Sequence, residues 1–112
     1  MIGINIETVQ QVTIIKLDGE IDANVAPEVQ KRVLLLAGPG CKILMDMTKL
    51  AYMSSAGLRM LLSVYRQISG NQGQVALTRL SDELKDTMSM TGFLGFFTVY
   101  DSIESGLQAL AQ

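Results

Sequence analysis

The sequence predicts an α/β domain in which a mostly parallel, mixed sheet of about five strands is combined with about four helices. Apolar residues follow a period of two or run continuously in short segments, and in the intervening segments they recur at helical spacing. After the second strand the two kinds of segment alternate, which requires crossovers and therefore a largely parallel sheet. The 112 residues contain no internal repeat or linker, so we expect a single domain over residues 1–112.

The N-terminal segment predicts two paired strands. Ile2, Ile4 and Ile6 alternate with small or polar residues, as in a half-buried strand. Residues 12–17 are apolar or β-branched on both faces, and the sequence at 18–20 is expected to end this second strand. The first strand should be an antiparallel member at an edge of the sheet.

The first helix is expected after Asp22. Pro27 falls in its first turn, where a missing N–H costs no hydrogen bond, and Gly38-Pro39-Gly40 ends it. A strand from Cys41 to Met47 follows. The apolar stripe of the helix consists of Val25, Val29, Val33 and Leu36.

A second helix is expected to end at the glycine-rich residues 70–73, and residues 74–78 then alternate as a short strand. Ser81 is a candidate cap for a third helix that stops near Gly92. The apolar face of the second helix consists of Leu58, Leu61, Leu62, Tyr65 and Ile68.

The C-terminal residues predict one more strand and one more helix. Residues 96–100 are expected to form the last strand, and Asp101 with Glu104 resembles a capping box that opens the final helix. The stripe of that helix consists of Ile103, Leu107 and Leu110.

Composition argues against several function classes. The chain has no histidine, which removes the usual general base and the commonest metal ligand, so we expect no enzyme, metal or cofactor. The net charge of -2 is mixed along the chain without a basic stripe, which argues against direct nucleic-acid binding. No apolar run approaches the length of a membrane span. The lone Cys41 and the absence of a signal peptide favour a cytoplasmic protein.

Residues 46–59 join a strand to the second helix and carry the most information. Ser54 or Ser55 can cap that helix, and the free N–H groups of its first turn favour an anion, including a phosphate on serine. From the residues alone, two serines before an apolar helix predict a cap. A serine nucleophile is disfavoured because Met53 occupies the first glycine position of a nucleophile elbow and no histidine is present.

Two motifs here resemble those of STAS-domain anti-sigma-factor antagonists, and together with the element order they cover essentially the whole chain. This resemblance implies the STAS fold. The first motif is Asp46-x-Thr48 followed by Tyr52-Met53-Ser54-Ser55-Ala56-Gly57-Leu58. The second is Leu17-Asp18-Gly19-Glu20-Ile21-Asp22.

The resemblance also implies the site. Ser55 aligns with the serine that a partner kinase phosphorylates in the family, and Ser54, which stands where the family often has Asp, is the second candidate. Asp22 is expected beside the serine, although it can also serve as a helix cap. The adjacent docking surface would include Ala56, Gly57 and Arg59; an arginine one turn into a helix is also typical of a solvated position.

The implied function is that of an anti-sigma factor antagonist. The unphosphorylated protein would bind an anti-sigma factor that is also a serine kinase of the histidine-kinase-like ATPase fold, and a sigma factor would be released. Phosphorylation would switch the protein off, and a serine/threonine phosphatase would reset it. The alternative is a constitutive STAS interaction subunit of a lipid-transport or signalling complex. Nucleotide binding is disfavoured because the chain lacks a P-loop sequence.

Overall fold

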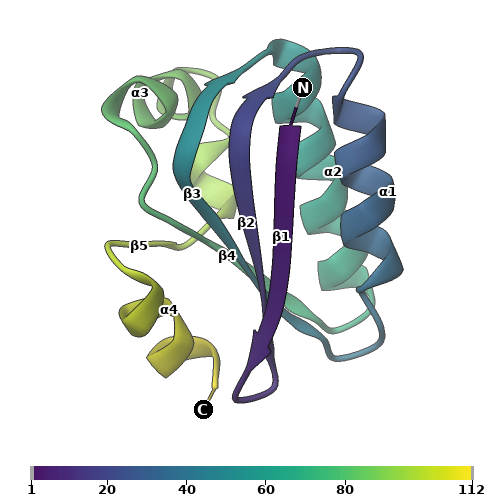
Figure 1. The fold of residues 1–112 in the computed structure, drawn as a ribbon. Coiled ribbons are helices and arrows are strands. Elements are labelled where there is room, and N and C mark those ends of the chain that lie inside the picture. The colour runs from purple at the N-terminus through teal and green to yellow at the C-terminus, as the bar shows by residue number, and fades with distance from the viewer. Residues whose placement is uncertain (1, 112) are drawn as a thin grey trace.

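The computed structural model describes residues 2–111, which form a five-stranded sheet with four α-helices and one 3-10 helix. Figure 1 shows α1 and α2 together on one side of the sheet and α4 on the other. The strands are β1 (Ile2–Val9), β2 (Val12–Ile21), β3 (Lys42–Met53), β4 (Gln74–Thr78) and β5 (Val99–Tyr100). The helices are α1 (Ala26–Leu35), α2 (Ser55–Gly70), α3 (Asp82–Met90), η1 (Leu94–Phe96) and α4 (Ile103–Leu110).

The sheet has the strand order β1-β2-β3-β4-β5. β1 pairs with β2 in antiparallel register, and β2, β3, β4 and β5 pair in parallel. The tight connection between β1 and β2 places Gln10 and Gln11 at positive φ, which is the backbone geometry of a two-residue hairpin turn. The predicted fold class, with an antiparallel N-terminal strand at the edge of a parallel sheet, is confirmed.

Both central strands are longer than the sequence predicted. β2 continues past Asp18 to Ile21 and β3 continues past Met47 to Met53, because the two strands keep pairing through register shifts on either side of Gly19. Gly19 has a φ of +125°, a conformation open to glycine, and this irregularity lets the ladder continue through a polar stretch. The expected strand ends at 18–20 and at Met47 were therefore wrong.

The main core lies between the sheet and the α1–α2 layer. Val29 and Val33 of α1 pack here with Leu61 and Val64 of α2, and α3 adds Leu84 and Met88. The buried face of α2 also includes Met60, which the predicted stripe omitted, whereas Leu36 at the end of α1 is exposed. A smaller core under α4 consists of Val12, Ile14, Leu44, Ala76 and Leu110.

The C-terminal region departs from two expectations. The last strand contains only Val99 and Tyr100, because η1 occupies part of the predicted strand. The capping box of α4 is one residue later than predicted: the Ser102 hydroxyl accepts from the Ser105 N–H at 3.1 Å, and the Ser105 hydroxyl accepts from the Ser102 N–H at 3.3 Å. The predicted cap of α3 is confirmed, since Ser81 accepts from the Leu84 N–H at 3.2 Å.

Candidate functional site

The candidate site lies where the parallel strands β2 and β3 end side by side. Ile21 pairs with Met53, and the Ser54 N–H donates to the Ile21 carbonyl at 2.8 Å. This backbone bond places the residue after β2, Asp22, next to the start of α2. The sequence motifs at 17–22 and 46–58 therefore meet in space although a whole helix separates them in the chain.

Ser54 is the N-cap of α2. Its backbone is extended, with a φ of -75° and a ψ of 174°, and its hydroxyl accepts from the Gly57 N–H at 3.3 Å. The side chain is partly buried. Of the two cap candidates in the sequence, the structure thus selects Ser54.

Ser55 is the first residue of α2 and differs from Ser54 in both exposure and bonding. Its side chain is exposed, and within residues 2–111 its hydroxyl has no hydrogen-bond partner. The first turn of α2 contains no acidic residue, so no side chain of that turn neutralises the positive end of the helix dipole. An anionic group on Ser55 would lie at the end of a 16-residue helix that stabilises negative charge.

Gly57 is required by close packing beneath the serines. A Cβ at this position would lie 2.5 Å from Met53 Cγ and 3.0 Å from Ile21 Cγ2. Glycine therefore lets the first turn of α2 sit directly on the ends of β2 and β3. This close contact fixes how far Ser55 lies from the strand ends.

Asp22 organises the loop that faces the serines. Its Oδ1 accepts from the N–H groups of Asn24 and Val25, both at 3.0 Å, so the carboxylate closes the turn that precedes α1. The assigned N-cap of α1 is Val25 and has no side-chain cap. Asp22 therefore stabilises the approach to the helix instead of capping it, and no hydrogen bond joins it to Ser54 or Ser55 within residues 2–111.

A shallow groove of about 230 Å³ runs between α1 and α2 next to the serines. Ala56 and Arg59 line it from α2, and Ala23, Ala26 and Pro27 line it from the α1 side. Arg59 is exposed and forms no ion pair within residues 2–111, so its guanidinium is available to an acidic group. The predicted surface residues Ala56 and Arg59 are thus brought together.

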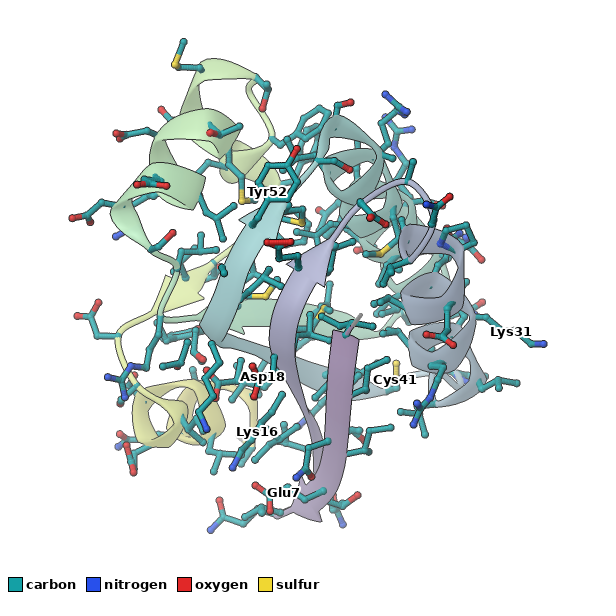
Figure 2. All side chains as sticks on the ribbon, turned by 45° about the horizontal axis from the view of Figure 1, so that its top comes forward. Glu7, Lys16, Asp18, Lys31, Cys41 and Tyr52 are labelled. Carbon is teal, nitrogen blue, oxygen red and sulfur yellow. The ribbon has the colours of Figure 1, made fainter. Side chains whose placement is uncertain are left out.

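Two contributors to this surface were not predicted from the sequence. No residue on the α1 side of the groove was predicted to be functional. The available signal was Pro27, which marks the first turn of α1 and therefore the end of the helix that lines the groove. Tyr52, two residues before Ser54, is 51% exposed near the end of β3 (Figure 2). Tyr52 belongs to the motif at residues 46–58, and this was the sequence signal for an exposed aromatic contact here.

Neither a metal site nor a reactive thiol is evident in the described part of the chain. Residues 2–111 contain no group of three or more metal-binding side chains placed to hold an ion. Burial raises the pKa of the Cys41 thiol, which disfavours a reactive thiolate.

None of the helices described is long and apolar enough to span a bilayer.

The structure defines a small α/β domain with a mixed five-stranded sheet and an exposed serine at the first position of its second helix. Residues 3–106 match the sequence pattern of the STAS domain, and the chain belongs to this family.

Two curated relatives carry related descriptions. The anti-sigma-B factor antagonist of Bacillus subtilis is 26% identical over 95% of this chain and 99% of its own length. The putative anti-sigma factor antagonist BtrV of Bordetella bronchiseptica is 35% identical over 68 residues, which are 61% of this chain; the match spans 59% of that relative's length.

Solved structures show the same fold. The anti-sigma factor antagonist from Mycobacterium paratuberculosis superposes with a TM-score of 0.88 at 19% identity, covering 100% of this chain and 96% of that chain. The phosphorylated form of the Bacillus cell fate determinant SpoIIAA superposes with a TM-score of 0.73 at 17% identity, covering 96% and 98%.

Proposed function

We propose that the protein is an anti-sigma factor antagonist that binds its anti-sigma factor through the surface around Ser55 and is switched off by phosphorylation of Ser55. The observation that carries this proposal is the exposed, unpartnered Ser55 hydroxyl at the start of α2. The curated relatives described as antagonists, and a structural neighbour described as phosphorylated, support it.

Ser55 is a better phosphate acceptor than Ser54. The Ser54 hydroxyl is partly buried and bonded to the Gly57 N–H, so its modification would remove the cap of α2. The Ser55 hydroxyl can enter a kinase active site without breaking any hydrogen bond of the described fold. We therefore assign the switch to Ser55 and keep Ser54 as the cap.

The switch acts through charge at the partner interface. Phosphorylation adds about -1.5 to -2 charges and three acceptor oxygens in the middle of the docking surface. The N-terminus of α2 tolerates that charge within this protein, whereas a partner surface must desolvate it or face it with its own acidic groups. Binding is lost without a large change of the antagonist's own fold.

The proposed partners follow from this role. The anti-sigma factor is also the serine kinase, with a histidine-kinase-like ATPase fold, and a serine/threonine phosphatase reverses the modification. The exchange takes place in the cytoplasm. The groove between α1 and α2, with Arg59 at its rim, supplies the rest of the docking surface.

The first test is intact-mass and phosphopeptide analysis after incubation with the candidate kinase and ATP. We expect a gain of one phosphate, about 80 Da, in the native protein and in Ser54→Ala, and no gain in Ser55→Ala. Phosphate on Ser54 in the Ser55→Ala variant would move the switch by one residue. No phosphate on any protein, with a kinase active on another substrate, would contradict the switch.

A binding assay separates the switch from the alternative function. The native protein and Ser55→Ala should bind the anti-sigma factor equally, and Ser55→Asp should bind at least about tenfold more weakly because the interface must desolvate its charge. Equal binding by all three would instead favour a constitutive interaction subunit.

A further inference from the structure

A cavity of about 440 Å³ with several charged residues in its lining lies on the sheet face opposite α1 and α2, away from the candidate phosphorylation site. On this face α4 covers Ile14 and Leu44. Two residues further along each strand, Lys16 and Asp46 lie beyond the helix and line the cavity. Figure 2 shows Lys16 and Asp18 on the α4 side of the molecule, whereas Lys31 lies on α1.

Asp46 is the buried polar group of this cavity. Only 8% of the residue is exposed, and its Oδ1 accepts from the Thr48 N–H at 3.1 Å, from the Thr48 hydroxyl, and from the Thr78 hydroxyl at 3.0 Å. Within residues 2–111 its Oδ2 accepts no hydrogen bond. The described side chains include no enclosed polar atom without a partner, so this second oxygen is not enclosed. Because Asp46 lines the cavity, we infer that the oxygen faces it and can accept from a ligand there.

Cationic side chains line the same cavity, and within residues 2–111 none of them forms an ion pair with this carboxylate. Lys49 and Arg79 line the cavity and form no ion pair within residues 2–111. The Lys16 ammonium lies 3.3 Å from a Glu7 carboxylate oxygen instead. Because the Lys16–Glu7 pair is neutral, the cavity holds two cations without an ion-pair partner, Lys49 and Arg79, whose charges balance those of Asp18 and Asp46.

We propose that this cavity binds a small zwitterion of net negative charge, with one ammonium and two carboxylates, as in a free acidic amino acid. The ammonium donates to the unpartnered Asp46 oxygen, and the two carboxylates pair with Lys49 and Arg79. Charge-assisted hydrogen bonds of this kind are the strong ones in a partly enclosed site. A simple anion would leave the Asp46 oxygen without a donor, and a simple cation would leave Lys49 and Arg79 without an anion.

The test is a titration of the ¹⁵N-labelled protein with L-glutamate, followed by amide chemical shifts. We expect saturable shifts at residues 16–18, 46–49 and 79. Arg79→Asn should weaken binding about tenfold, because one charge-assisted bond is lost. Asparagine tolerates the φ of +58° at this position, so the backbone should be kept. The matched control is Lys31→Gln, which removes an exposed cation on α1, far from the cavity. This variant should bind like the native protein.

Glutarate, which has both carboxylates but no ammonium, tests the role of Asp46 without altering the fold. It should bind at least about tenfold more weakly than L-glutamate. The proposal is overturned by any of three results: no saturable shifts up to about 20 mM L-glutamate, equal binding of glutarate, or equal binding by Arg79→Asn.

Discussion

Gly57 shows how one residue at the candidate site serves packing. An added methyl group there would collide with Met53 and Ile21, whereas no atom outside the local helix lies within 4 Å of a Cβ placed on Gly70 at the other end of α2. The two glycines share the same helix and therefore the same secondary structure, and they differ in how closely other side chains pack against them. They form a matched pair for substitution.

We predict that Gly57→Ala lowers the free energy of unfolding by about 1–2 kcal/mol, because overpacking outweighs the better helix propensity of alanine. Gly70→Ala should change it by less than about 0.5 kcal/mol. Urea denaturation of both variants measures the difference. Equal stability of the two variants would show that α2 shifts freely on the strand ends.

At the scale of elements, the start of α2 divides two tasks between adjacent serines. Ser54 closes the helix end, and Ser55 projects from it. The strand ends are held by the bond from the Ser54 N–H to the Ile21 carbonyl, which a side-chain substitution leaves in place. The cap can therefore be removed without separating β2 from β3.

Ser54→Ala should destabilise the protein by about 0.5–1 kcal/mol through loss of the cap, and Ser55→Ala by less than about 0.5 kcal/mol. Thermal or urea unfolding of the two variants provides the comparison. If Ser55→Ala proved the more damaging, the roles given to the two hydroxyls would be reversed.

At the scale of the whole molecule, the two proposed sites lie on different parts of one sheet. The serines follow the end of β3, and Asp46 lies in the middle of the same strand, on the face that α4 partly covers. The main core between the sheet and the α1–α2 layer does not contain either site's charged groups. A phosphate on Ser55 is therefore expected to leave this core intact.

We predict that the phosphorylated protein keeps the fold and that its free energy of unfolding changes by less than about 1 kcal/mol, since the helix dipole stabilises the added charge. Amide shifts should change at residues 22–26 and 52–60 and stay unchanged in α4. Shifts spread across both cores would instead indicate a conformational switch.

The sequence by itself determined the class of fold, because the spacing of apolar residues along the chain indicates helix or strand without knowing which segments pack together. It also placed both serines at the start of α2, and the resemblance singled out Ser55. Only the tertiary structure decided that Ser54 is the cap, because two adjacent hydroxyls have the same local propensity and differ only in where the backbone directs them.

Pairing between distant strands decided the rest. β2 and β3 extend through polar residues because each supplies the other's hydrogen bonds, which no local pattern records. That pairing brings Asp22 to the serines. Likewise, Thr78 reaches Asp46 only because β4 lies beside β3, so the cavity on the far face of the sheet depends on contacts between residues far apart in the chain.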